Sequence, residues 1–343
     1  KLIGAKPEEI IFTAGATEST NFIIKGYLDY RKYYGDGKNH VITSLVEHKA
    51  TLNTCRYLNG ELYSNNDPTI SLFGEKKRVD RGFEASFVGV TSNGEISVEE
   101  IEKAINENTA LVSMIYVNNE IGSISDVSSV SKICKSHNIA LHSDLTQALG
   151  KLEIDVKKLG IDYASCSAHK IYGPKGIGAA YMKSDAYGIA PITAFMHGGE
   201  QEYGYRAGTH AVHNIVGFGK AAEIALRDMK KNEAHIQKLD ELLLRGIANI
   251  DGIHTTVNVS KRIPGIISII VEKEDFHNER FIKKISEEVA LSTGSACSAG
   301  EPSYVIQALG LGDKVAKVLR VSINKFTTES DINEFLKVLK AEI

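Results

Sequence analysis

Short apolar runs alternate with helical segments from Glu9 to about Gly217, and this alternation constrains the fold more than any other feature of the chain. Strand-like apolar runs occupy residues 41–44, 110–117, 139–143, 163–165 and 178–182. Strands that alternate with helices are typical of an α/β layer structure, in which a sheet is covered by helices on both faces. The sequence therefore predicts a large α/β domain with a mainly parallel sheet over residues 1–225.

The remaining residues predict a linking helix and a smaller α+β domain over residues 226–343. A long helical pattern runs from 212 to 250 and carries an apolar stripe at Leu239, Leu242, Leu243 and Leu244. It is followed by a strong strand at 265–271, a helix at 281–289 and a closing helix at 331–339. No internal repeat or low-complexity tract is present.

Composition excludes several classes of function. The 343 residues are 43% hydrophobic and 24% charged, with a formal net charge of -3 and no long Lys/Arg run, so neither a nucleic-acid partner nor a membrane surface is expected. The longest apolar runs fall far short of the ~20 residues of a membrane helix, and the first residues do not resemble a secretory signal. We expect a soluble cytoplasmic protein.

One lysine lies in an unusual setting. The segment Ser165-Cys166-Ser167-Ala168-His169-Lys170 is followed at once by a glycine-rich turn at 173–178. A lysine held between small hydroxyl residues and such a turn is a candidate for a Schiff base with pyridoxal phosphate (PLP). PLP would need two further supports, an anion for its pyridine nitrogen and donors for its phosphate.

Both supports can be found upstream. Asp144 ends an apolar run and is expected to lead directly into a helix, and ligand-binding side chains of open α/β sheets lie at such strand ends. A carboxylate there would favour a protonated pyridine ring. The turn at 13–17 precedes a helical pattern, and the N-terminus of a helix binds phosphate. Taken singly, each feature also has a common structural explanation: a surface lysine, a helix cap and a simple turn.

The four cysteines are dispersed without a Cys-x-x-Cys pair, so neither a zinc site nor a disulfide framework is indicated. Cys55 and Cys134 fall in amphipathic helical patterns, and Cys166 is expected to be buried. Cys297 differs, because the segment 294–300 is small and polar, which suits an exposed loop with a mobile thiol. The residues alone leave open whether this thiol is inert or reactive.

Several segments, in this order along nearly the whole chain, resemble cysteine desulfurases of the NifS and IscS kind, in the class V aminotransferase group of PLP enzymes. They are residues 15–19, Glu47-His48-Lys49-Ala50, 117–122, 142–147, 167–178, 197–199 with 206–209, 292–297 and 320–322. The resemblance implies a fold of the aspartate aminotransferase type (fold type I). It also implies that the chain lacks the usual N-terminal segment of the family.

The resemblance assigns roles to individual residues. Lys170 would form the Schiff base and later move protons, and Asp144 would pair with the pyridine nitrogen. Gln147 would donate to the phenolic oxygen, with Asn119 near that oxygen and the substrate. His48 would stack on the ring and take part in acid/base steps. Phosphate would be held by Ala16, Thr17, Ser167, His169 and, from a second subunit, Thr209.

The implied reaction converts L-cysteine to L-alanine. Arg320 would bind the substrate carboxylate through its fork of donors, and the Cys297 thiolate would attack the substrate sulfur to leave a persulfide on the enzyme. His48 is the candidate for accepting the Cys297 proton. The partners implied are a protein sulfur acceptor, either a scaffold for iron–sulfur clusters or a sulfur carrier for thio-modification, and a second copy of the chain in a homodimer. No metal is implied.

Two alternatives remain open from the sequence. A selenocysteine lyase or another class V aminotransferase-type enzyme would share the fold and the lysine. A catalytically silent subunit of a sulfur-transfer complex would share the fold without the reaction, although the joint presence of Lys170, Asp144 and Cys297 argues against decay.

Overall fold

The computed structural model describes residues 1–61, 79–185, 187–294 and 302–343, and the chain divides into two compact units. The first unit comprises residues 1–89, 96–116 and 126–227, and the second comprises 90–95, 117–125 and 228–343. The helix α7 (Val212–Ile247) contributes to both units, because the boundary falls between residues 227 and 228. Two short segments from the first half of the sequence therefore belong to the second unit.

A seven-stranded sheet, counted over the described residues, organises the first unit in the order β1-β7-β6-β5-β4-β2-β3. Neighbours from β6 to β3 pair in parallel, whereas β7 is antiparallel to β6 and to β1. All residues of β2, β4, β5 and β6 are buried, as expected of strands covered on both faces. The predicted mainly parallel α/β sheet is confirmed. The strands are β1 (Ile10–Thr13), β2 (His40–Ser44), β3 (Glu84–Val88), β4 (Thr109–Ile115), β5 (Ala140–Asp144), β6 (Tyr163–Ser167) and β7 (Gly178–Met182).

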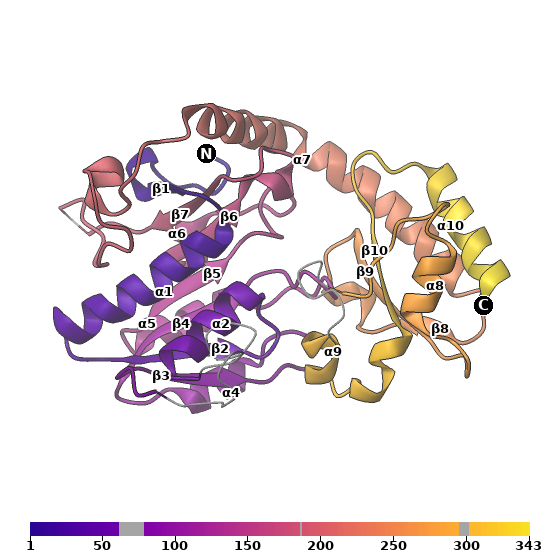
Figure 1. Cartoon of the computed structure of the whole chain (residues 1–343), viewed down its shortest axis with the longest axis horizontal. Coiled ribbons are helices and arrows are strands. Elements are labelled where there is room, and N and C mark those ends of the chain that lie inside the picture. The colour runs from indigo at the N-terminus through magenta and orange to yellow at the C-terminus, as the bar shows by residue number, and fades with distance from the viewer. Residues whose placement is uncertain (62–78, 186, 295–301) are drawn as a thin grey trace, which may run out of the picture. The chain divides into compact units, whose positions relative to one another are not determined.

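Helix α1 (Ala16–Tyr33) packs against the central strands of this sheet (Figure 1). Its apolar face follows helical periodicity, and Phe22, Ile23 and Leu28 are fully buried against the sheet. The other helices of the unit are α2 (Lys49–Leu58), α4 (Val98–Ala104), α5 (Val127–Ser136) and α6 (Val156–Leu159), with the 3-10 helices η1 (Pro7–Glu9), η2 (Ala168–Ile171) and η3 (Gln201–Gly204).

The second unit is built on a three-stranded antiparallel sheet, again counted over the described residues, in the order β10-β9-β8. Leu239 and Leu243 of the predicted apolar stripe are buried in its core with Ile267 of β9 and Phe335 of the closing helix. Its elements, visible in orange to yellow in Figure 1, are β8 (Ile253–Thr255), η4 (Val259–Lys261), β9 (Ile266–Val271), α8 (Asn278–Lys284), α9 (Tyr304–Ala308), η6 (Gly312–Lys317), β10 (Val318–Ser322) and α10 (Glu329–Glu342).

Two local expectations were wrong. The helix expected at 281–289 is α8, which begins at Asn278 and ends at Lys284, where the hydroxyl of Ser286 donates to the carbonyl of Lys283 and competes with helical hydrogen bonding. The helix expected after Asp144 is instead a series of turns over residues 146–151, which includes the left-handed Gly150. Among the described residues no helix combines the length and the apolar character needed to cross a bilayer.

Candidate active site

The carboxyl ends of β5 and β6 bring Asp144 and Lys170 to the same edge of the sheet. The two strands are parallel, with Asp144 opposite Ser165, and Lys170 lies in η2 directly after β6. Asp144 is the last residue of β5 and is buried, and its Oδ1 accepts a 2.9 Å hydrogen bond from the backbone N–H of Thr146. This edge is where open α/β sheets bind ligands.

His48 is electrostatically coupled to both of these residues. Burial lowers the pKa of His48, the Asp144 carboxylate acts to raise it, and the positive charges of Lys170 and Lys49 lower it further. His48 is therefore neutral at neutral pH. Asp144, His48 and Lys170, which the sequence predicts at the ring end of PLP, are therefore close enough for the charges of Asp144 and Lys170 to shift the pKa of His48.

The N-cap of α2 determines which nitrogen of His48 carries the proton. Nδ1 accepts a 3.1 Å hydrogen bond from the backbone N–H of Ala50. A neutral imidazole that accepts at Nδ1 carries its hydrogen on Nε2, and this tautomer follows from the hydrogen bond. Nε2 is thus the donor, and a proton taken up at Nδ1 would break the cap.

The first turn of α1 and the end of β6 lie close together at the position where the sequence predicts a phosphate site. The first N–H groups of a helix have no partner within the helix, so those of Ala16 and Thr17 are available to an anion. A Cβ built on Gly15 would lie 3.9 Å from Oγ of Ser167, and one built on Gly178 would lie 2.6 Å from Cα of Gly15. The absence of these side chains brings the two backbones together. Oγ of Ser167 is also 2.7 Å from Nδ1 of His169.

An ion pair stands beside this phosphate site. Nε of Arg206 donates to Oε1 of Glu18 at 2.7 Å, and the backbone N–H of Ala14 donates to Oε2 at the same distance. The pair connects the first turn of α1 to the segment that carries Thr209, which is exposed and follows Gly208 at a φ of 107°.

Two buried or partly buried groups near the site were not selected from the sequence. Nζ of Lys151 donates a 2.8 Å hydrogen bond to Oε1 of Gln147, and burial together with the charge of Lys170 lowers the pKa of Lys151 to about 8. Glu47 is fully buried, and burial, assisted by the charge of Asp144, raises its pKa to about 8. The sequence offered one signal for each residue. Lys151 lies four residues after Gln147, and Glu47 lies directly before His48.

Glu47 ties the end of β2 to the end of β4. Its Oε1 accepts hydrogen bonds from Oγ of Ser44 at 2.7 Å and from the backbone N–H of Ile115 at 2.8 Å. The carboxyl therefore fixes the turn from which His48 projects relative to the neighbouring strand.

Asn119 and Arg320 lie together in the second unit. Nη1 of Arg320, on β10, donates a 3.1 Å hydrogen bond to the backbone carbonyl of Asn119. Within the described residues, Nε of Arg320 and Oδ1 of Asn119 are buried and have no hydrogen-bond partner. Because buried polar atoms are normally paired, the unpaired guanidinium donor and amide acceptor indicate a ligand site. The guanidinium donor suits a carboxylate, whereas the amide oxygen can only accept a hydrogen bond.

Cys297 lies outside the described residues, whereas the other three cysteines are free and buried. Burial raises the pKa of Cys134 and of Cys166 to about 12, and it raises that of Cys55 still further. All three therefore remain protonated thiols at neutral pH, and the expectation that Cys166 is buried is confirmed.

Known proteins resemble this chain over its whole length. The profile of the family "Aminotransferase class-V" matches residues 1–63 and 73–335. Proteins named cysteine desulfurase IscS from Aeromonas salmonicida and Shewanella sediminis are 39% and 41% identical over 346 residues, which cover 100% of this chain and 79% of each relative.

Solved structures agree with this result. A NifS-like protein is 33% identical, with a TM-score of 0.83 over 99% of this chain and 84% of its own. DndA from Streptomyces lividans is 31% identical, with a TM-score of 0.76 over 94% of this chain and 85% of its own. The chain therefore belongs to the aminotransferase class-V family, within its group of cysteine desulfurases.

Proposed function

We propose that this chain is a PLP-dependent cysteine desulfurase that converts L-cysteine to L-alanine and stores the sulfur as a persulfide on Cys297. The arrangement of Asp144, His48 and Lys170 at one edge of the sheet is the observation that carries the proposal. The family and its named relatives support the same reaction.

The residues fit PLP at both of its ends. The buried Asp144 carboxylate suits a protonated pyridine nitrogen, and Gln147 offers its amide hydrogens to the phenolic oxygen, because its Oε1 is already engaged by Lys151. The first turn of α1, with the hydroxyl of Ser167 beside Gly15, offers donors to the phosphate. When bound, PLP supplies an electron sink that stabilises negative charge next to the substrate α-carbon.

The protein groups then bind the substrate and move its protons. Arg320 binds the substrate carboxylate through its Nε donor, which has no partner among the described residues, and Asn119 lies beside the substrate. Nζ of Lys170 takes the α-proton and returns a proton to the product. His48 stacks on the ring and donates through Nε2, since Nδ1 caps α2.

Cys297 is the nucleophile in this proposal. The remaining thiols are buried and protonated, so none of them can supply the thiolate that attacks sulfur. In the attack, an S–S bond forms and the C–S bond of the substrate breaks. The bonding pair stays with the β-carbon, which takes a proton and becomes the methyl group of alanine.

The persulfide would be passed to a protein acceptor, which we propose to be a scaffold for iron–sulfur clusters or a sulfur carrier. We further propose a cytoplasmic homodimer in which Thr209 completes the phosphate site of the second copy. The exposure of Thr209 supports this role.

Mass spectrometry after incubation with PLP and cysteine tests the proposal. The wild type should release alanine and gain one sulfur atom at Cys297. Cys297→Ala should lose this adduct, whereas Cys134→Ala, a matched loss of a buried thiol, should keep it. Alanine release without an adduct at Cys297 would refute the thiol role. Reduction of the PLP-loaded protein with borohydride should label Lys170, and a label on another lysine would refute the cofactor assignment.

A further inference from the structure

A buried glutamate in the second unit contacts the described residues at both ends of the segment that carries Cys297. Glu120 is 2% exposed, and its Oε2 accepts a 2.6 Å hydrogen bond from Oγ of Ser303. Ser303 follows that segment closely. On the other side, a Cβ built on Gly294 would lie 3.1 Å from the same Oε2. One carboxylate oxygen therefore lies against Gly294 and binds Ser303.

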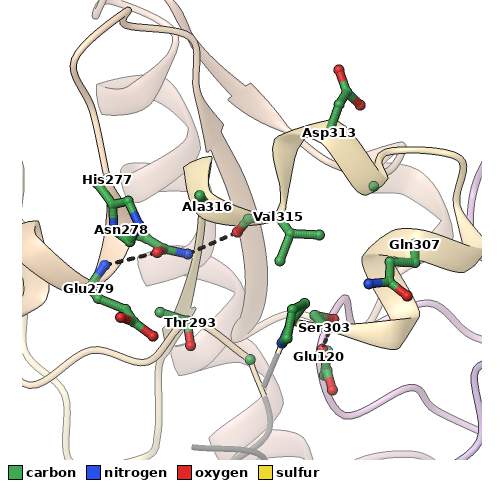
Figure 2. A pocket seen from close by; sticks show the side chains of 13 residues that line it. Glu120, His277, Asn278, Glu279, Thr293, Ser303, Gln307, Asp313, Val315 and Ala316 are labelled. Atoms are coloured by element: carbon green, nitrogen blue, oxygen red, sulfur yellow. Dashed lines mark hydrogen bonds between the residues drawn. The ribbon is translucent and has the colours of Figure 1, made fainter. Parts of the chain in front are cut away.

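These contacts form part of the wall of a cavity of about 380 Å³. Figure 2 shows the hydrogen bond between Ser303 and Glu120 at its edge, with Thr293 close by. The hydroxyl of Ser303 also accepts from the backbone N–H of Ile306 at 3.2 Å and thereby caps α9. Through Ser303, Glu120 is connected to the start of a helix rather than to a free loop.

The backbone of Glu120 is fixed as well. Oδ1 of Asn118 accepts hydrogen bonds from the N–H groups of Glu120 and Ile121, at 2.8 and 3.1 Å. The preceding residue, Asn119, accepts from Nη1 of Arg320. Burial lowers the pKa of Arg320, and the charge of the Glu120 carboxylate raises it. The two side chains therefore interact electrostatically.

We propose that Glu120 is a positioning residue that holds Gly294 and Ser303, the described residues on either side of the segment that carries Cys297, in a fixed position relative to Arg320. The inference rests on the proposed desulfurase function. It predicts that Glu120 serves sulfur transfer to the thiol and not the binding of cysteine or the removal of its α-proton.

Three substitutions test the contact from different sides. Glu120→Ala removes the carboxylate, Ser303→Ala removes the donor, and Gly294→Ala places a methyl group against Oε2. Gly294 does not have a positive φ, so alanine is compatible with its backbone. Glu120→Gln is the conservative variant, because its amide can still pair with the hydroxyl of Ser303.

The control for Ser303→Ala is Ser97→Ala. Oγ of Ser97 caps α4 by accepting from the backbone N–H of Glu100 at 3.2 Å, so its loss removes a comparable N-cap without touching Glu120. Ser303→Ala remains informative if Glu120→Ala does not fold.

Two steps should be measured separately in the PLP-loaded enzyme: single-turnover persulfide formation on Cys297, and exchange of the α-proton of alanine with solvent deuterium. We expect persulfide formation to be about tenfold slower in Glu120→Ala, Ser303→Ala and Gly294→Ala, which is the scale of one lost hydrogen bond to a charged group. In the same variants, the rate of α-proton exchange and the KM for cysteine should stay within about twofold of the wild type. Glu120→Gln and Ser97→Ala should match the wild type.

A readout that needs no cofactor complements these rates. The rate at which iodoacetamide alkylates Cys297 in the PLP-free protein should change at least threefold in Glu120→Ala and Ser303→Ala. The rate should not change in Ser97→Ala.

Equal losses in proton exchange and persulfide formation, or a Glu120→Gln variant as slow as Glu120→Ala, would overturn the positioning role. A wild type that exchanges the proton of alanine but makes no persulfide would instead refute the proposed function, so the two failures are distinguishable.

Discussion

The ammonium group of Lys151 donates a 2.8 Å hydrogen bond to the side-chain oxygen of Gln147, four residues earlier in the turns that follow β5. A lysine ammonium can only donate, so it fixes the orientation of an amide whose two ends otherwise look alike. In the proposed PLP site, the NH2 group of Gln147 is thereby kept for the phenolic oxygen. Lys151 would then belong to the cofactor site through this contact.

Replacing Lys151 by methionine should weaken PLP binding about fivefold to tenfold. The hydrogen bond is lost, and the amide of Gln147 can turn its oxygen toward the phenolic oxygen, where two acceptors would face each other. Fluorescence titration of PLP into the cofactor-free protein measures the effect. Lys157→Met, at a half-exposed lysine 3.9 Å from Glu9, is the control and should bind PLP like the wild type. Equal affinity in the two variants would contradict the prediction.

Glu47 should make the cofactor-free protein less stable as the pH rises. Its pKa is about 8 in the folded protein against an ordinary value of 4.5, because burial disfavours the charged form. Between these values the folded state keeps a proton that the unfolded state has lost. The free energy of unfolding therefore falls from pH 4.5 to 8, by about 5 kcal/mol, and levels off above pH 8.

Glu47→Gln removes this titration and keeps the acceptor for Ser44 and Ile115. Urea unfolding between pH 5 and 9 should show a flatter profile than the wild type, with the variant more stable at pH 8. Glu100→Gln is a control at an exposed glutamate that also accepts a backbone hydrogen bond, from Gly89, and it should keep the wild-type slope. An unchanged slope in Glu47→Gln would show that the carboxyl is ionised in the folded protein.

Substitutions of His48 should separate its role as the N-cap of α2 from its proposed role in stacking on the ring of PLP. Asparagine is a good N-cap residue and keeps the hydrogen bond to Ala50 without an aromatic face, whereas phenylalanine keeps a ring without the cap. In the cofactor-free protein, His48→Ala and His48→Phe should each lose about 1 kcal/mol of stability and His48→Asn much less. For PLP, His48→Asn and His48→Ala should bind about threefold to tenfold more weakly, and His48→Phe less so. Wild-type PLP affinity in His48→Asn would argue against stacking.

The ion pair between Arg206 and Glu18 should protect the phosphate site from a negative charge. Glu18 lies in the first turn of α1, where an uncompensated carboxylate would repel the phosphate dianion. Arg206→Gln should therefore weaken PLP binding about tenfold, and the double variant Glu18→Gln with Arg206→Gln should recover most of that loss. Equilibrium dialysis against PLP measures both. A double variant as weak as the single one would mean that Arg206 acts on the phosphate directly.

Much of the site followed from local sequence. Asp144 ends a buried strand, Lys170 follows the next one, and parallel neighbours necessarily bring such ends to one edge. The first turn of α1 was identifiable for a similar reason, since small residues before a helix leave N–H groups open. These features depend on the periodicity of apolar residues in strands and helices, which can be read directly from the sequence.

Other parts of the molecule depended on contacts between distant residues. Glu47 and Glu120 lie in segments that carry the family resemblance, and Lys151 lies outside them, but the sequence assigned a role to none of the three. Their roles arise because Gln147, Ile115 and Ser303 happen to lie within hydrogen-bond distance in the folded chain. The local error at α8 has the same origin on a smaller scale, because one serine hydroxyl ended the helix early.

The sequence alone determined the α/β class, and it predicted the lysine, the acid and the cysteine of the proposed PLP chemistry. These are properties of residue order and of short-range periodicity. Only the tertiary structure decided that segment 117–125 belongs to the second unit, where Asn119 contacts Arg320. It also decided which ring nitrogen of His48 carries the proton and which carboxyl groups are buried. The physical reason is that burial and hydrogen bonding set protonation and orientation, and both depend on neighbours that the chain brings together only when it folds.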